Sequence, residues 1–207
     1  MMGRAQVAGL DVSRETVERL EQLAVLLAKW NPAINLVSKS TLPEAWTRHI
    51  VDSAQLFRLA PARVAHWADL GSGGGFPGLV IAALSAELDP ARKITLVESD
   101  QRKSTFLRQA AQALGLTNVA VLTERIERAQ PLAGQVVSAR ALAPLPQLCA
   151  FAQHHLAPEG VALFPKGAKH AEEVAEAGRT WHFDLTVHPS DTDSSAVVLE
   201  LRTIGHV

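Results

Sequence analysis

The ten residues DLGSGGGFPG, positions 69–78, decide the fold of this chain. They end a short apolar run, Val64–Leu70, that we predict to be a β-strand, and they lead into an apolar segment, Phe76–Leu88, that we predict to be a helix. Glycine lets a backbone turn tightly and approach a ligand without a Cβ in the way, and the helix that begins there adds free N–H groups. Four glycines within residues 71–75 are more than a plain turn requires, so we predict a ligand-binding loop.

Two kinds of ligand compete for this loop. Residues 73–78 match G-x-G-x-x-G, the dinucleotide pattern, whereas the register that starts at Asp69 matches acidic-x-G-x-G-x-G, the first motif of S-adenosylmethionine-dependent methyltransferases. The Asp69 carboxylate suits a ligand with an ammonium and a sulfonium group better than a pyrophosphate. Phe76-Pro77 also puts a ring and a nitrogen without hydrogen where a pyrophosphate needs N–H donors. The methyl donor is therefore favoured, and under either interpretation Glu98, after the next strand, is placed to accept the ribose hydroxyls.

Short apolar strands and helical stretches alternate on the C-terminal side of the loop. This alternation predicts a parallel sheet with helices on both faces. The last two β-patterned stretches are joined by the turn-rich segment Pro189–Ser195, so we expect them to pair antiparallel. The predicted fold class is α/β: a Rossmann-like class I methyltransferase sheet, parallel with an antiparallel C-terminal hairpin, plus an N-terminal helical cap. The further predicted strands are Ile94–Val97, Val119–Leu122, Val136–Val137 and Val161–Phe164, the helices are Gln101–Leu114, 145–156 and 168–178, and the hairpin is Trp181–His188 with Ala196–Thr203.

The N-terminal part of the chain has helical periodicity. Apolar residues recur at three- and four-residue steps, with Ser13 as the predicted N-cap and Asn31-Pro32 as the predicted end of the first helix. Residues 41–44, TLPE, form a capping-box pattern that predicts the start of a second helix. On that helix Arg48 and Asp52 have the i, i+4 spacing of an ion pair. The predicted domains are a helical cap, residues 1–62, and a donor-binding domain, residues 63–207.

Composition limits the remaining possibilities. The chain has 207 residues, of which 47% are apolar and 20% charged, and its net charge of −1 means that an RNA partner would have to bind a local basic patch. It has no apolar run near the ~18 residues of a membrane helix and no signal-peptide layout at its start. The single cysteine, Cys149, excludes a disulfide within the chain, and His154-His155 lacks a third metal ligand. We therefore expect a cytoplasmic protein without a metal, and a monomer, since no heptad pattern is sustained.

Several short blocks occur together in a specific combination. The most specific are RHIVDS at residues 48–53 and the FPG ending of the glycine loop; further blocks are WN at 30–31, ES at 98–99, RK at 102–103, SARA at 138–141 and KG at 166–167. With these blocks the chain resembles the small-subunit ribosomal RNA methyltransferase G family, the bacterial 16S rRNA guanine-N7 methyltransferases also called glucose-inhibited division protein B. The resemblance extends from Trp30 to about Gly167.

The resemblance implies a cofactor, a partner and a set of site residues. The cofactor is S-adenosyl-L-methionine, the partner is the 16S rRNA of the small ribosomal subunit, and the target is N7 of the guanine at position 527 in the usual rRNA numbering. Arg140, at the end of a strand, is expected to be catalytic. The predicted cofactor-binding residues are Asp69, Gly71, Gly73, Gly75, Phe76, Glu98, Ile126, Glu127 and Arg140, and the predicted RNA-binding residues are Arg48, His49, Arg102, Lys103 and Lys166.

Methylation of a guanine N7 is consistent with the absence of two motifs that other base methylations require. Methylation of a pyrimidine C5 needs a cysteine beside the fourth strand, and Cys149 lies well past it. Methylation of an exocyclic amine usually goes with an Asn/Asp-Pro-Pro-aromatic motif, which Ser138–Ala141 does not match. N7 carries a lone pair and no proton, so an in-line transfer needs no general base, and alignment of the reactants supplies most of the catalysis. Two alternatives stay open: a nicotinamide-dependent oxidoreductase and a non-catalytic RNA-binding assembly factor.

Overall fold

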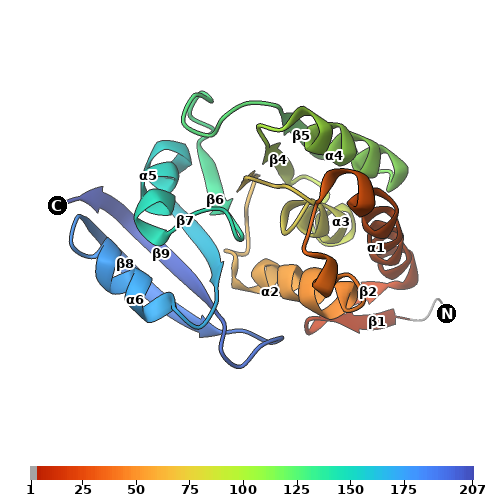
Figure 1. Ribbon diagram of the computed structural model, residues 1–207, viewed down its shortest axis with the longest axis horizontal. Helices are drawn as coiled ribbons and strands as arrows, with labels where there is room; N and C mark the ends of the chain where they lie inside the picture. Colours follow the sequence, from red (N-terminus) through yellow and green to blue (C-terminus); the bar gives the residue numbers. More distant parts are fainter. Residues whose placement is uncertain (1–3) are drawn as a thin grey trace.

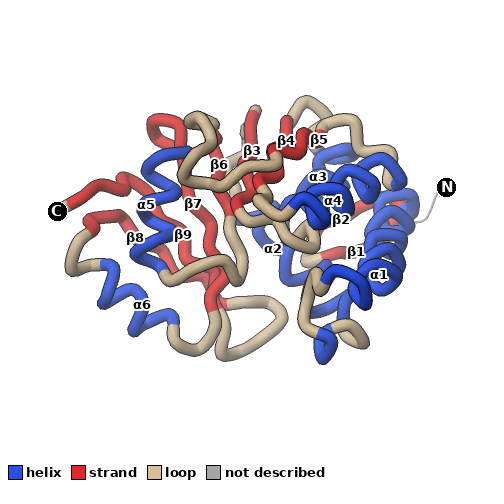
Figure 2. Tube along the Cα trace, turned by 45° about the horizontal axis from the view of Figure 1, so that its top comes forward, coloured by secondary structure: helices blue, strands red, loops and turns tan. Residues whose placement is uncertain are grey.

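The computed structural model describes residues 4–207. Its centre is a seven-stranded sheet in the order β5-β4-β3-β6-β7-β9-β8 (Figure 1; β3 is labelled in Figure 2). The pairs from β5 to β7 are parallel, whereas β9 runs antiparallel to both β7 and β8. The predicted fold class, a mostly parallel sheet with an antiparallel C-terminal hairpin, is thereby confirmed. The strands of the sheet are β3 (His66–Leu70), β4 (Lys93–Val97), β5 (Val119–Leu122), β6 (Gly134–Ser138), β7 (Leu156–Lys166), β8 (Trp181–Pro189) and β9 (Val197–His206).

Helices cover both faces of the sheet because its strands are apolar on both sides. Along β7, Val161 and Leu163 belong to one hydrophobic cluster, while Ala162 and Phe164 belong to the other. Figure 2 shows α1–α4 gathered at one end of the molecule and α5 and α6 beside β7–β9 at the other. The helices are α1 (Arg14–Ile34), the 3₁₀ turn η1 (Lys39–Thr41), the π-helical segment η2 (Trp46–Val51), α2 (Asp52–Leu59), α3 (Gly78–Leu88), α4 (Gln101–Ala113), α5 (Leu145–His155) and α6 (His170–Ala177).

The first helix begins as predicted but ends later. Ser13 is the N-cap, and its Oγ accepts a hydrogen bond from the Thr16 N–H at 3.3 Å. The prediction that Asn31-Pro32 ends the helix was wrong, because α1 continues to Ile34 and ends at Asn35, which has a left-handed φ of 48°. The carbonyl that the missing Pro32 N–H leaves without a helical partner belongs to Ala28, an exposed residue, so the helix tolerates the proline here.

The second helix begins later than the sequence pattern at residues 41–44 predicted. The capping box was wrong: the Thr41 hydroxyl donates to the Ser38 carbonyl at 2.8 Å and makes no helix cap. The chain instead passes through η1 and the wide turns of η2 before α2 begins. The π-helical turns change the spacing of side chains, and the predicted pair of Arg48 with Asp52 does not form. Asp52 pairs with Arg140 instead, from another part of the chain.

A β-hairpin that we did not predict precedes α1. The strands β1 (Arg4–Val7) and β2 (Leu10–Ser13) pair antiparallel through a two-residue turn, Ala8-Gly9, in which both residues have positive φ. The N-terminal elements share one hydrophobic cluster with a face of the sheet, in which Leu20 and Ile50 lie with Trp67. Residues 1–3 of the predicted cap lie outside the described residues, and the division at residues 62 and 63 stays a prediction. Within residues 4–207 there is no helix of the length and apolarity that crossing a membrane requires.

Candidate active site

A cavity of about 1260 Å³ opens at the carboxyl ends of the parallel strands. The chain leaves β3 and β6, which are neighbours in the sheet, toward opposite sides, and ligands of open α/β sheets bind at such a switch point. The wall of the cavity is made by the glycine loop, the ends of β4, β6 and β7, the segment after β5, and residues of η2, α2, α5 and α6. The cavity therefore brings together parts of the chain that are far apart in the sequence.

The glycine loop has the shape of a cradle. Gly73 has a φ of +51°, and a Cβ added there would meet only the Gly71 carbonyl oxygen at 3.7 Å, so the loop is open toward the cavity at this point. Gly75 has a φ of +88°, and a Cβ there would collide with Leu79. The two glycines thus serve different needs: Gly73 leaves space for a ligand, whereas Gly75, which is not part of the cavity wall, allows the loop to pack on α3.

Asp69 does not lie where we expected it. It is fully buried beneath the loop and is not part of the cavity wall. Its Oδ1 accepts a hydrogen bond from the Ser138 hydroxyl at 2.7 Å, its Oδ2 accepts one from the Gly78 N–H at 3.2 Å, and Ser138 in turn accepts one from the Trp67 indole at 2.8 Å. Burial raises the pKa of Asp69 to about 6, although the hydrogen bonds from Ser138, Ser72 and Gly78 act in the opposite direction. In this arrangement Asp69 holds the glycine loop and α3 in place.

The start of α3 distinguishes between the two alternative ligands of the glycine loop, the dinucleotide and the methyl donor. Pro77 has no N–H, the Gly78 N–H donates to Asp69, and the Leu79 N–H donates to the Gly75 carbonyl at 2.8 Å. The donors that a pyrophosphate requires at a helix N-terminus are therefore already used within the chain. This geometry disfavours a dinucleotide and agrees with a ligand that carries no phosphate.

Glu98, directly after β4, lies in the cavity wall, and its contact with ribose hydroxyls stays a prediction. Its Oε2 accepts a hydrogen bond from the Gly73 N–H at 2.9 Å, and its Oε1 accepts one from the Asp100 N–H at 2.8 Å. These two bonds fix the carboxylate against the glycine loop. Each oxygen retains an acceptor site, so the residue fits a pair of ribose hydroxyls.

The segment after β5 contributes Ile126 and Glu127 to the wall, the first nearly buried and the second exposed. Two histidines of α5 hold this segment: the His155 Nε2–H donates to the Ile126 carbonyl and the His154 Nε2–H donates to the Ala129 carbonyl, both at 2.9 Å. Sequence reasoning considered this histidine pair only as metal ligands and missed its supporting role. The pairing of α5 with a segment that lies about 25 residues earlier in the chain has no local signal.

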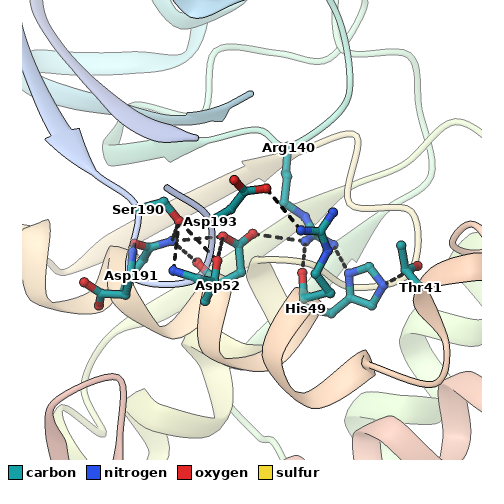
Figure 3. Close-up of polar contacts among 10 residues, drawn as sticks. Thr41, His49, Asp52, Arg140, Ser190, Asp191 and Asp193 are labelled. Atoms are coloured by element: carbon teal, nitrogen blue, oxygen red, sulfur yellow. Dashed lines mark hydrogen bonds and ion pairs between the residues drawn. The ribbon is translucent and has the colours of Figure 1, made fainter. Parts of the chain in front are cut away.

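Arg140 connects the sheet to the N-terminal cap. It follows β6, lies in the cavity wall, and donates from Nη1 to Asp52 Oδ2 at 3.2 Å and to the Arg48 carbonyl at 3.0 Å (Figure 3). Its Nη2 donates to Nδ1 of His49 at 2.9 Å, and its guanidinium carbon lies 5.2 Å from the centre of the Phe76 ring. The His49 ring also stacks on Phe76, with ring centres 5.0 Å apart. The predicted cofactor residues Phe76 and Arg140 are thus in contact.

The five predicted RNA-binding residues do not form one exposed group. His49 is buried, with both ring nitrogens bonded, so it is not available to RNA in this conformation. The Lys166 ammonium is bonded to Glu173 at 2.6 Å and to the Ala143 carbonyl at 2.9 Å. Arg48, Lys103 and Lys166 belong to the cavity wall, whereas Arg102, with 71% of its side chain exposed, lies outside it.

This sheet order, with a glycine loop after β3, a carboxylate after β4 and an antiparallel last strand, defines a class I S-adenosylmethionine-dependent methyltransferase. Solved structures of this class share the fold. The chain resembles the ribosomal protein L11 methylase of Lactobacillus delbrueckii subsp. bulgaricus, with a TM-score of 0.59, 16% identity and coverage of 77% of this chain and 78% of that one. It also resembles M. jannaschii TYW2 in complex with AdoMet, with a TM-score of 0.55, 11% identity and coverage of 83% and 78%.

The family follows from the sequence comparisons. The model of the family described as rRNA small subunit methyltransferase G matches residues 16–196. Two curated proteins with that name, from two strains of Cereibacter sphaeroides, are 55% and 50% identical to this chain; the alignments cover 96% and 100% of the chain and 95% and 100% of those proteins. The chain belongs to the rRNA small subunit methyltransferase G family. The predicted family is thereby confirmed, and with it S-adenosyl-L-methionine as the methyl donor.

Proposed function

We propose that the protein transfers a methyl group from S-adenosyl-L-methionine to N7 of the guanine at position 527 of 16S rRNA in the small ribosomal subunit. The observation that carries the proposal is a single cavity whose wall holds both the glycine loop and Arg140, while the candidate nucleophile and base of the region are unavailable. Cys149 is fully buried away from this wall, and burial raises its pKa to about 12. Both ring nitrogens of His49 are engaged by Thr41 and Arg140. A lone pair on N7 requires neither a nucleophilic cysteine nor a base.

The donor side of the site follows from the chain's own residues. S-adenosyl-L-methionine supplies an electrophilic methyl group on a cationic sulfur. Glu98 would accept the ribose hydroxyls, Ile126 and Glu127 would flank the adenine, and the glycine loop would hold the methionine part next to Phe76. Asp69 acts from below by fixing the loop, since it does not reach the cavity. Well-oriented reactants gain roughly 7–11 kcal/mol over reactants free in solution, so a rigid donor site supplies much of the rate.

The acceptor side is formed by Arg140 and the basic residues around the cavity mouth. The Arg140 guanidinium would donate to the target base, and Arg48, Arg102, Lys103 and Lys166 would contact phosphates of the rRNA. Arg48 and Lys166 are now paired with Asp193 and Glu173, so each would exchange a carboxylate for a phosphate. We also expect a monomer that acts in the cytoplasm, where the small subunit is found.

The test is methyl transfer from S-adenosyl-L-methionine to small subunits that lack this modification, mapped by mass spectrometry of nucleosides and RNA fragments. The expected result is 7-methylguanine at one position, 527. Transfer to another base or another atom would refute the proposed target. Binding of the donor with no transfer to any form of the subunit or its RNA would favour the assembly factor, and binding of NAD in place of the donor would favour the oxidoreductase.

A further inference from the structure

The Arg140 side chain is held on one side only. Three of its five N–H groups donate to Asp52, to the Arg48 carbonyl and to His49. The other two, Nε–H and one Nη2–H, have no partner among residues 4–207, and the residue forms part of the cavity wall. Only 16% of the side chain is exposed. The guanidinium is therefore oriented by its neighbours before any substrate arrives.

The bond between Arg140 and His49 defines the state of the histidine. An arginine can only donate, so Nδ1 of His49 accepts, and the proton of the neutral ring lies on Nε2. Nε2 is 2.9 Å from Thr41 Oγ1, whose own proton goes to the Ser38 carbonyl. Burial, with the nearby charges of Arg140 and Arg48, lowers the pKa of His49 to about 4. The donor and the acceptor of each hydrogen bond from Arg140 through His49 and Thr41 to Ser38 are thus determined, and His49 adds no charge to the cavity wall.

Asp52 is the centre of the network and is held from two directions. Its Oδ2 accepts from Arg140, and its Oδ1 accepts from the Thr192 hydroxyl and from the Gln55 side chain, both at 3.0 Å. Gln55 in turn accepts from the Asp191 N–H at 3.0 Å, so the loop between β8 and β9 is fastened to α2 (Figure 3). The Asp52 side chain is 16% exposed, the same fraction as that of Arg140. Two largely buried charges of opposite sign therefore face each other beside the cavity.

The position of this pair matters for a cationic ligand. The Arg140 guanidinium lies 5.2 Å from the Phe76 ring, next to the glycine loop, and the loop and the guanidinium line the same cavity. Unlike charges in a partly dehydrated site interact more strongly than in water, and like charges repel more strongly. An arginine without its aspartate would disfavour a sulfonium in this cavity. Because the positive charge passes to the base during transfer, the same cost would apply to the methylated guanine.

We propose that Asp52 and His49 are positioning residues that hold Arg140 toward the acceptor, and that Asp52 also balances its charge so that the cavity admits a cationic methyl donor. The inference rests on the proposed function, since it takes the methyl donor and a purine as the two ligands. A purely structural role, in which the network only joins the N-terminal cap to the sheet, would show itself in the free energy of unfolding alone.

The decisive measurement compares a charged ligand with a neutral one of the same shape. S-adenosylmethionine carries the sulfonium, and S-adenosylhomocysteine does not. Isothermal titration of Asp52→Asn with both ligands should show a loss of affinity for the cationic ligand relative to the neutral one, by roughly three- to tenfold, as expected for one unbalanced charge at the wall of an open cavity. The matched control is Glu87→Gln, which alters a carboxylate that joins α3 to the start of α1 outside the cavity and should leave this ratio unchanged.

A second variant gives a change of opposite sign and covers the case in which Asp52→Asn does not fold. Arg140→Gln removes the cation and leaves Asp52 in place, so the preference for S-adenosylmethionine over S-adenosylhomocysteine should increase. For His49, the Ala variant should raise the KM for the small subunit, and the Asn variant, whose Oδ1 replaces Nδ1 as an acceptor, should restore part of it.

The outcomes are distinguishable from a failure of the proposed function. Equal effects of Asp52→Asn on both ligands, or a fall in the unfolding free energy with an unchanged ratio, would overturn the charge-balancing role. Equal KM values for His49→Ala and wild type would overturn the positioning role. If the wild-type protein bound neither S-adenosylmethionine nor S-adenosylhomocysteine, the proposed function would be refuted, and the proposed role of Asp52, which rests on it, would be refuted as well.

Discussion

Asp69 makes the stability of the protein depend on pH in an unusual direction. Burial raises its pKa from 3.8 to about 6, so the folded protein binds this proton more tightly than the unfolded chain does. Between these two pKa values the folded state holds more protons, and stability therefore falls as pH rises. The Asp69 carboxyl is completely buried, so water does not screen its charge. The shift corresponds to about 3 kcal/mol at roughly 1.4 kcal/mol per pKa unit, present below pH 4 and lost by about pH 6.

The perturbation is Asp69→Asn, which has nearly the same shape and cannot ionise. Urea unfolding of both proteins from pH 4 to pH 7 gives the free energy of unfolding at each pH. Every other titrating group is common to both proteins, so the difference between the two curves isolates Asp69. The wild type should lose about 2 kcal/mol relative to the variant over this range, because at pH 4 the unfolded carboxyl is already mostly ionised. Ser138→Ala, which removes a hydrogen bond that lowers the pKa, should extend the loss to higher pH.

Parallel curves for wild type and Asp69→Asn would refute this reasoning, because they would mean that the carboxyl has the same pKa in the folded and the unfolded protein. A relative gain in wild-type stability with rising pH would also refute it. That result would show that the hydrogen bonds from Ser138 and Gly78 outweigh burial and lower the pKa.

Four further predictions concern the site. Gly73→Asp should abolish binding of S-adenosylmethionine in calorimetry while the protein still folds, and unchanged donor affinity in this variant would reject the loop as the donor site. Gly75→Ala should instead lower the free energy of unfolding by about 1–3 kcal/mol, because the added Cβ would collide with Leu79. Arg140→Ala should reduce kcat/KM for methyl transfer about a hundredfold with a smaller effect on folding, and equal turnover would remove it from the site. His155→Leu should weaken donor binding severalfold, because it frees the Ile126 carbonyl; equal affinity would show that the segment after β5 holds without it. Arg102→Ala should raise KM for the subunit and flatten its salt dependence at an unchanged melting temperature, since the side chain is largely exposed; an unchanged salt dependence would place Arg102 outside the RNA contact.

The sequence alone was sufficient for the sheet and for the glycine loop. The alternation of strands and helices predicted the sheet and its antiparallel end, and nearly every strand lies within a few residues of its predicted range. The glycine loop and Glu98, which both line the cavity, could be predicted because they depend on local features: a tight turn directly after one strand and a carboxylate directly after the next. Short-range backbone geometry determines such features, so a linear pattern records them.

Only the tertiary structure decided how the side of the cavity around Arg140 is built. The pairing of Arg140 with Asp52 and His49, and the fastening of Asp52 by Thr192, join residues 88 to 140 positions apart, and no local pattern encodes such a distance. The same holds for Asp69, whose motif predicted a ligand contact but whose burial under Ser138 and Gly78 makes it a support of the loop. The i, i+4 rule failed at Arg48 and Asp52 because π-helical turns changed the side-chain spacing, and each side chain pairs with a residue distant in the sequence: Arg48 with Asp193 and Asp52 with Arg140. Which residues form an ion pair in such a largely buried network depends on which charged side chains the fold brings together away from water. The packing of the sheet, the N-terminal cap and the C-terminal hairpin determines this.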